Sequence, residues 1–137
     1  MGNTITPFAY EAQTGALSTL QTLPTLPDGY TGDNHTADIH VHPNGKFLYG
    51  SNRGHDSIAI YAIDSETGTL EALGQESTRG EGPRNFMIDP SGTFLLAGNG
   101  QTDTVVTFRI NQESGALEET GHVAQIPSPV CLLALPR

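Results

Sequence analysis

The chain has 137 residues, 16 of them glycine and 9 proline, and its formal net charge is −9. This length fits one globular domain, and the many turn-forming residues favour numerous short elements over a few long ones. Because nucleic acids and anionic membranes are bound by basic surfaces, the acidic balance argues against both as the main partner.

Two features predict a cytoplasmic protein. The N-terminus, MGNTITPF, has neither the basic region nor the apolar segment of a signal peptide. Cys131 is the only cysteine, so it forms no disulfide within the chain, which fits a reducing compartment. Its apolar surroundings, VCLLAL, predict a buried and unreactive thiol.

Residues 1–31 are expected to form the last strands of a four-stranded unit. The stretch ITPFAYEAQTGALSTL resembles the second half of the unit that follows it. Gly15 and Leu17 lie 53 positions before their counterparts Gly68 and Leu70. The chain therefore begins, in this interpretation, partway through a repeated element.

Two complete units are predicted at 37–79 and 83–124. HPNGKFLYGSNRGHDSIAIYAIDSETGTLEALG and DPSGTFLLAGNGQTDTVVTFRINQESGALEETG align without a gap, with matched residues 47 positions apart. Each unit divides into four short β segments separated by turn-forming residues; the first contains DIHVH, KFLYGS, SIAIYAI and TLEALGQ. Residues 128–137, which begin SPVCLLAL, resemble GPRNFMID and are expected to form the first strand of a further unit.

Four-strand units of this length that stack radially are the blades of a β-propeller. The predicted fold is all-β, with two full blades of four antiparallel strands and a partial blade at each end. Closed propellers have about 4–8 blades, so this chain cannot close a ring alone. We expect a piece of a longer polypeptide, an assembly of several copies or an open stack. Since open sheet edges promote association, a homo-oligomer formed through open blade edges is expected.

The connections between strands alternate between two faces of such a propeller. Tight turns such as HPNGK and DSETG fall on one face, and the other receives NRGHD, NGQTD and the long loops between blades. The variable face is predicted to carry a cluster of cationic or ionisable side chains, namely Arg53, Arg79, Arg84, His35 and His55. Such a cluster suits an anionic ligand, a carboxylate or a phosphate ester. Ordinary solvated loops are the alternative.

Comparison of the two units separates the residues of NRGHD. Asn52 and Asp56 recur in the second unit, so we interpret them as turn-forming residues that bond backbone amides. Arg53 and His55 are replaced there by glycine and threonine, so the turn does not require them. These two are candidate site residues, with a surface or stacking role as the alternative.

The first strand of the complete unit carries further candidates. Asp38 and His40 are predicted to face a central channel close to the loops, with solvated channel lining as the alternative. His40 and His42 form an H-x-H pair that points to one face of a strand, but no third ligand is apparent and no metal is expected. Gly82-Pro83 is predicted to aim Arg84 at the channel mouth.

With SNRGHDSI, GPRNFMIDPSG and the paired turns DSETGTL and NQESGAL, the sequence resembles the lactonase family of seven-bladed propellers, typified by bacterial 6-phosphogluconolactonase. The resemblance covers essentially the whole chain, and PSPVCLLAL is similar to the carboxyl end of that family. It implies that the chain corresponds to the C-terminal portion of a member. It also implies hydrolysis of a small anionic sugar lactone without a metal or organic cofactor.

The resemblance implies roles for five residues. Arg53 matches the arginine of the family's NRG motif, His55 the histidine that follows it, and Arg84 the arginine of its PR motif. Asp38 stands where members often have glutamate. In the implied mechanism Asp38 or His40 activates water, while Arg53 and Arg84 bind the anionic group and stabilise the tetrahedral oxyanion. The catalytic candidates are therefore Asp38, His40, Arg53 and His55, and the substrate-binding candidates are Arg53 and Arg84.

Two other functions stay open. One is a propeller-fragment scaffold or binding module without chemistry. The other is a lyase that cyclises or opens carboxymuconates, because the fungal carboxymuconate-cyclising enzymes are relatives of the family. Whether the chain is itself an enzyme depends on residues that the other blades would supply.

Overall fold

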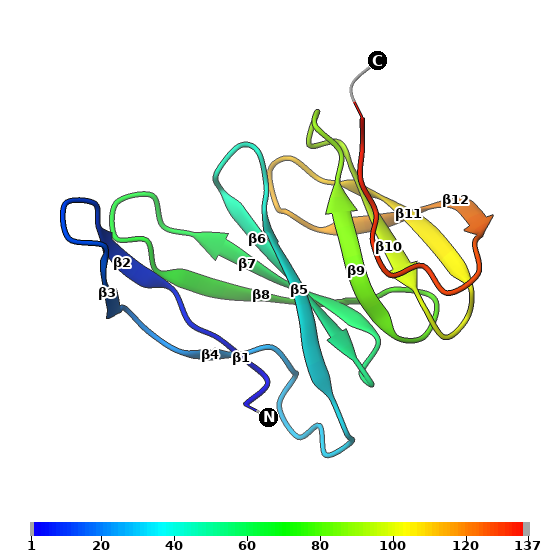
Figure 1. Ribbon diagram of the computed structural model, residues 1–137, viewed down its shortest axis with the longest axis horizontal. Helices are drawn as coiled ribbons and strands as arrows, with labels where there is room; N and C mark the ends of the chain where they lie inside the picture. The colour runs from blue at the N-terminus through cyan, green and yellow to red at the C-terminus, as the bar shows by residue number, and fades with distance from the viewer. Residues whose placement is uncertain (1, 136–137) are drawn as a thin grey trace.

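The computed structural model describes residues 2–135, and every regular element in that range is a β-strand (Figure 1). No helix within this range is long and apolar enough to cross a membrane. The strands are β1 (Thr4–Ile5), β2 (Phe8–Glu11), β3 (Ala16–Thr19), β4 (Leu23–Pro24), β5 (His35–Val41), β6 (Phe47–Arg53), β7 (Ser57–Ile63), β8 (Leu70–Ser77), β9 (Pro83–Ile88), β10 (Phe94–Asn99), β11 (Thr104–Ile110) and β12 (Leu117–Gln125).

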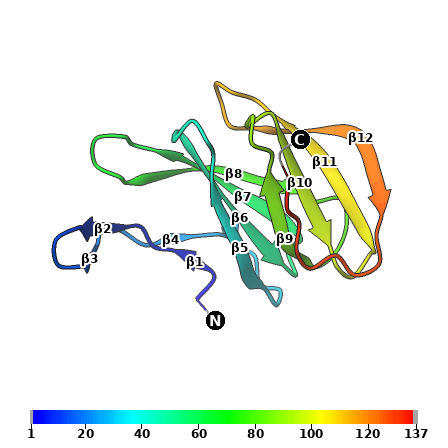
Figure 2. The ribbon, with the colours of Figure 1, turned by 45° about the horizontal axis from the view of Figure 1, so that its top comes forward.

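The longer strands form two four-stranded antiparallel sheets. One has the order β5-β6-β7-β8 and the other β9-β10-β11-β12, so each sheet keeps its strands in chain order. Figures 1 and 2 show the two sheets stacked, with β5 and β9 following one another along the same side. The predicted all-β fold, built of four-stranded antiparallel blades, is confirmed, and β5 and β9 are the inner strands of the two complete blades.

Tight turns with matching chemistry connect the strands. The Oδ1 atom of Asp64 accepts two backbone N–H groups in the turn after β7, and Oδ1 of Asn111 accepts two in the turn after β11. Gly68 and Gly115 follow with φ angles of 71° and 72°, in the left-handed region that favours glycine. The same local requirement therefore explains why these turns look alike in the sequence.

The N-terminal strands occupy the places of the two outer strands of a blade. β1 pairs with β4, and β2 pairs with β3. Pro7, which has no N–H group, lies where β1 and β2 are interrupted. The N–H and hydroxyl groups of Thr25 both donate to the carbonyl of Asn3, at 2.9 and 3.0 Å. Thr78 makes the same two bonds to the carbonyl of Asp56, at 3.0 and 3.1 Å, so β1–β4 correspond to β7 and β8.

Apolar side chains fill the space on both sides of the first complete sheet. Ile58 and Ile60 of β7 belong to the larger core cluster, which the second sheet closes with Phe86 and Phe108. On the opposite side of β7, Ala59 and Tyr61 pack with Ile5 of β1 and with other residues of a smaller cluster, namely Leu48, Leu70, Leu23 and Ile63. The continuous apolar run of this strand therefore reflects a sheet covered on both faces.

The segment expected to be a first strand at 128–137 forms no strand in its described part, 128–135. Residues 136 and 137 lie outside the described residues. The N–H of Leu132 donates to Oδ1 of Asn85 at 2.6 Å, so the segment runs beside β9 where an inner strand would lie. At 47-residue spacing, the counterpart of β10 would fall beyond residue 137, so no described strand pairs with the segment.

Cys131 lies in this unpaired segment and is exposed. The predicted buried thiol is therefore wrong. The residues around Cys131 are apolar, as the sequence shows, but Leu133 is also 80% exposed. An apolar side chain is buried only where another element covers it, and here the described chain leaves Cys131 and Leu133 uncovered.

Candidate functional site

Two of the predicted site residues, Arg53 and Arg84, line one cavity. Arg53 is the last residue of β6 and Arg84 is the second residue of β9, so they come from two different sheets. This arginine cavity has a volume of about 180 Å³, and loop residues complete its wall: Gly82, Gly100, Gln101, Ser128 and Val130. The structure thus brings together, at the loop ends of the two blades, the pair that the resemblance assigns to substrate binding.

The guanidinium of Arg53 has one donor atom without a partner. Its Nε atom is buried and has no hydrogen-bond partner within residues 2–135. A buried donor without a partner costs about 1–3 kcal/mol, and a guanidinium matches the geometry of carboxylate and phosphate. Arg84 is exposed, and neither arginine forms an ion pair with a described acidic side chain. Both positive charges are therefore available to a ligand.

Arg79, the third arginine of the predicted cluster, lies elsewhere. Its Nη2 atom is 2.8 Å from Oε1 of Glu76, and its Nε atom is 3.0 Å from Oε2 of Glu119. These carboxylates belong to β8 and β12, the outer strands of the two blades. The charge of Arg79 is balanced there, so the expected cluster of three arginines is reduced to the pair in the arginine cavity.

His55 packs behind its turn and does not line the arginine cavity. Its Nδ1 atom is 2.7 Å from the hydroxyl of Ser57, and its ring meets Tyr30 edge-on with centroids 4.9 Å apart. The backbone N–H of His55 donates to Oδ1 of Asn34 at 3.1 Å. These contacts attach the turn to the loop before β5, which agrees with the stacking alternative for this residue.

Asp38 and His40 lie side by side on β5. Oδ2 of Asp38 is 3.1 Å from Nε2 of His40, and the His40 ring meets the buried ring of Phe86 edge-on at 4.8 Å. Because a carboxylate only accepts hydrogen bonds, Nε2 carries the hydrogen, and the lone pair of the neutral ring is on Nδ1. The Nδ1 atom forms no hydrogen bond with the part of the chain that the structure describes.

The Asp38 carboxylate is occupied by donors. Besides His40, Oδ2 accepts from the Asn85 side-chain amide at 2.5 Å and from the Phe86 N–H at 3.2 Å, while Oδ1 accepts from the Ile39 N–H at 2.9 Å. A carboxylate offers about four lone-pair positions, and four donors point at this one. Asp38 is therefore arranged to hold neighbouring groups in place.

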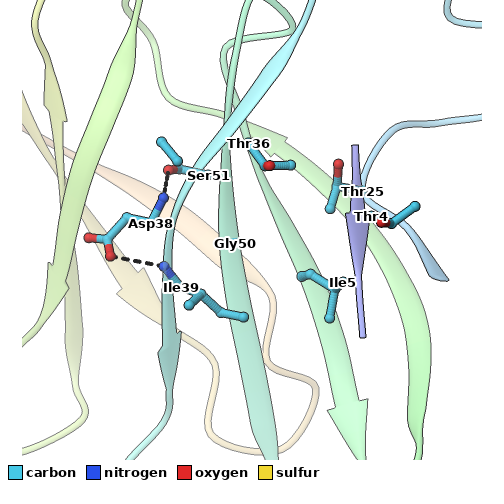
Figure 3. A pocket seen from close by; sticks show the side chains of 9 residues that line it. Thr4, Ile5, Thr25, Thr36, Asp38, Ile39, Gly50 and Ser51 are labelled. Atoms are coloured by element: carbon cyan, nitrogen blue, oxygen red, sulfur yellow. Dashed lines mark hydrogen bonds between the residues drawn. The ribbon is translucent and has the colours of Figure 1, made fainter. Parts of the chain in front are cut away.

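A second cavity, of about 160 Å³, separates β1 from β5 and β6 (Figure 3). Its lining includes the hydroxyl groups of Thr4, Thr25 and Thr36 and no cationic side chain. Figure 3 shows the Asp38 carboxylate pointing away from Thr4 and Thr25. With neither a cation nor an available carboxylate, this cavity offers less chemistry than the arginine cavity does.

The arginine cavity and the Asp38–His40 pair are neighbours along the inner strands, but they do not share one cavity. Arg84 directly precedes Asn85, the residue whose amide holds Asp38. On β5, Asp38 lies three residues beyond His35, which is paired with Arg53. The arginines thus lie toward the loop end of the blades, and the acid–base pair lies further along the same strands.

His42 has different hydrogen-bond partners from His40. Its Nε2 atom donates to the carbonyl of Gly92 at 2.8 Å, and its Nδ1 atom accepts the N–H of Asn44 at 3.1 Å. Nδ1 therefore holds the turn after β5, and Nε2 joins this turn to the corresponding turn of the next blade. Residues 2–135 contain no group of three histidine, cysteine, aspartate or glutamate side chains placed to hold a metal ion.

Sequence reasoning did not single out several residues that shape this region. Gln101 and Ser128 line the arginine cavity, and Asn85 bridges Asp38 to the C-terminal segment. Asn85 had a usable signal, because it lies 47 positions after Asp38 and is itself polar. Gln101 and Ser128 are ordinary loop residues, and only the stacking of the blades places them at the cavity.

Comparisons with known proteins agree with the geometry. The family model of the lactonase, seven-bladed β-propeller, matches residues 1–134. Over 87 residues the chain is 34% identical to a 6-phosphogluconolactonase of Bacillus subtilis, a match that covers 64% of this chain and 25% of the relative. The chain spans about a quarter of the length of the first curated relatives that it matches.

Two solved structures show the same arrangement of strands. A periplasmic gluconolactonase of Pseudomonas aeruginosa superposes with a TM-score of 0.92 at 31% identity, over 98% of this chain and 38% of that one. A protein from Lactobacillus plantarum superposes with a TM-score of 0.90 at 34% identity, over 95% of this chain and 38% of that one. With the family model matched along nearly its whole length, this chain belongs to the lactonase family of seven-bladed β-propellers.

Proposed function

We propose that the protein takes part in hydrolysis of a sugar lactone that carries an anionic group, and that Arg53 and Arg84 bind this group. The observation that carries the proposal is the arginine cavity itself. Two guanidinium groups line about 180 Å³ of space, and one of them has a buried Nε–H without a partner. A doubly charged phosphate in the cavity would balance both arginines, and a carboxylate would balance one of them.

The hydrogen bonds of the Asp38–His40 pair support His40 as the group that activates water. Asp38 fixes the ring with its hydrogen on Nε2, which leaves Nδ1 to accept a proton. The water oxygen then attacks the lactone carbonyl and forms a tetrahedral oxyanion. When the ring C–O bond breaks, the proton returns to the leaving alkoxide, and the product is the open hydroxy acid. An arginine near the carbonyl would stabilise the oxyanion.

An assay of lactone hydrolysis tests the proposal. Folded protein that includes the further blades, checked by circular dichroism, should open 6-phosphogluconolactone faster than the spontaneous rate, and it should act more slowly on the neutral gluconolactone. Arg53→Ala should abolish the difference from the spontaneous rate. Arg79→Ala is the matched control, because Arg79 is a loop arginine whose charge is balanced by two glutamates. Hydrolysis no faster than in buffer, by protein shown to be folded, would sink the proposal.

The substrate preference carries information of its own. Equal rates on the phosphorylated and the neutral lactone would leave lactone hydrolysis standing and remove the arginine pair from substrate binding. The relatives extend well beyond the region matched here, so groups from further blades are expected to complete the site. The complete activity is therefore proposed for this chain together with those blades.

A further inference from the structure

One oxygen atom joins the two parts of the chain that carry the arginines of the cavity. Oδ1 of Asp56 accepts the N–H of Gly54 at 3.1 Å within its own turn. The same atom accepts the N–H of Gly82 at 2.9 Å, 26 residues further along the chain. Gly54 follows Arg53, and Gly82 comes two residues before Arg84. Asp56 thus ties the turn of one blade to the loop that enters the next.

The backbone of Asp56 holds the other end of the same loop. Its carbonyl accepts both the N–H and the hydroxyl of Thr78, which is fully buried. Asp56 adopts a φ of 52°, a left-handed conformation that aspartate, asparagine and glycine tolerate best. Side chain and carbonyl together fix both ends of the segment 78–82.

The position of Gly82 determines where the backbone of Arg84 lies. Gly82 is buried, lines the arginine cavity and has a φ of 68°. Its carbonyl accepts the N–H of Arg84 at 2.7 Å and the N–H of Gly100 at 3.1 Å. Pro83, which follows, has a fixed φ and leaves little freedom between Gly82 and Arg84. A shift of Gly82 would therefore move Arg84 relative to Arg53.

In the next blade, an aspartate likewise connects its turn to the following loop, but no arginines are joined there. Asp103 has a φ of 56°, and its Oδ1 atom accepts the N–H of Ser128 at 2.7 Å. Its carbonyl accepts the N–H of Ile126 at 2.9 Å. Gly100 takes the place of Arg53, and the loop carrying Ser128 has no cation at the cavity. The tie between turn and loop is thus a feature of both complete blades, and of the two ties in residues 2–135 the one at Asp56 joins two arginines.

We infer that Asp56 is a positioning residue, which holds the loop 78–84 so that Arg84 faces Arg53 across the arginine cavity. The inference rests on the proposed function for the role of that cavity. Asp56 itself does not line the cavity, so it acts through Gly54 and Gly82.

Three variants of the full chain separate this role from a general effect on folding. Asp56→Gly keeps the left-handed backbone without strain and removes the acceptor. Asp56→Asn keeps both the conformation and an Oδ1 acceptor. Asp64→Ala is the control, because the Asp64 carboxylate also accepts two backbone N–H groups, in a tight turn on the opposite face.

Two NMR measurements give the result. Exchange of the Gly82 amide hydrogen should accelerate about five-fold or more in Asp56→Gly and stay near the wild-type rate in Asp56→Asn and Asp64→Ala. Titration with inorganic phosphate, followed through the Nε–H signals of Arg53 and Arg84, should show about five-fold weaker binding in Asp56→Gly alone.

Wild-type phosphate affinity in Asp56→Gly, or equal loss in Asp56→Asn, would overturn the inference. So would equal loss in Asp64→Ala, since the effect would then be one of general stability. Absence of phosphate binding by the wild-type protein would overturn both the inference and the role of the arginine cavity as an anion site. Intact phosphate binding without any lactone hydrolysis would contradict the proposed function alone and leave the role of Asp56 standing.

Discussion

The carboxylate of Asp38 accepts a hydrogen bond from the side-chain amide of Asn85, with 2.5 Å between Oδ2 and Nδ2. Asn85 in turn accepts the N–H of Leu132 through its Oδ1 atom. Asn85 lies 47 positions after Asp38, and Leu132 lies 47 positions after Asn85. Residues at equivalent positions of β5, β9 and the C-terminal segment are thus hydrogen-bonded to one another. These bonds add to the apolar packing between the sheets.

This link predicts a coupling between Asp38 and Asn85. Asp38→Ala should lower the free energy of unfolding by about 2 kcal/mol, because it leaves the Asn85 amide and the Phe86 N–H without their acceptor. In a double-mutant cycle with Asn85→Ala, measured by urea denaturation, the coupling energy should be about 1 kcal/mol. Strictly additive effects would mean that the bond contributes nothing to stability.

Asn52 and Asn99 occupy matching positions and are both fully buried, but we expect them to differ in their contribution to stability. Asn52 donates to the Thr25 carbonyl at 2.8 Å, and its Oδ1 accepts from Asn34 at 3.1 Å. Asn99 donates to the Thr78 carbonyl at 3.0 Å, whereas its Oδ1 has no partner among the described residues. Asn52→Ala should therefore cost about 3 kcal/mol, and Asn99→Ala at least about 1 kcal/mol less. Equal losses in urea denaturation would contradict this.

Alkaline pH should destabilise the fold through Tyr61. Burial raises the pKa of Tyr61 to about 12, from an ordinary value of 10.0, and its hydroxyl donates to the Pro24 carbonyl at 2.6 Å. Between these two values the unfolded chain loses the proton and the folded chain keeps it. The stability contributed by the neutral side chain is thus present below pH 10 and is lost as the pH rises toward 12.

Tyr61→Phe tests this dependence on pH. The variant should be less stable than the wild type at pH 7, because the bond to Pro24 is lost, and its stability should fall less steeply above pH 10. Urea midpoints measured from pH 8 to pH 11 give the comparison. The stability of the variant should still fall somewhat at alkaline pH, because burial also raises the pKa of Tyr49. Parallel curves for the two proteins would contradict the role of Tyr61.

The thiol of Cys131 should react in the folded protein. The side chain is exposed, so dithionitrobenzoate should modify one thiol per chain without denaturant, at a rate near that of a free cysteine. Cys131→Ser should show no reaction. Modification only after addition of urea would indicate that another surface covers the segment in solution.

The expected homo-oligomer stays a prediction, and the solution mass measures it. Large apolar side chains are exposed at both ends of the stack; examples are Tyr10 at 66%, Leu17 at 62%, Leu133 at 80% and Leu135 at 77%. Sedimentation equilibrium should give multiples of 14.5 kDa that rise with protein concentration. Leu133→Asp should shift the mass toward the monomer. A monomer at all concentrations would contradict the prediction.

The internal repeat made most of the fold predictable. Turn residues such as Asp64 and Gly68 act on their own neighbours, and short apolar segments bounded by such turns identify strands without knowledge of distant contacts. The strand order of both complete sheets followed from these local signals. The unpaired segment at 128–135 shows the limit, since its sequence is typical of a strand, but a strand needs a partner at its edge.

The candidate site divides in the same way. Comparison of the two units was enough to pick out Arg53 as unnecessary for its turn. Gly82-Pro83 and the family resemblance favoured Arg84 over Arg79 as a binding residue, but the bond from Gly82 to Asp56 that sets the course of the loop before Arg84 was not predicted. One arginine reaches the cavity, and the other pairs with Glu76 and Glu119.

By itself, therefore, the sequence determined the four-stranded blades, their turns and the candidate arginine of NRGHD, because each depends on residues close together in the chain. The tertiary structure alone decided which side chains meet between blades. Asp38 reaches Asn85 and Asp56 reaches Gly82 over separations of 47 and 26 residues. Those contacts depend on how one sheet is stacked on the next, which the residues within a single blade do not specify.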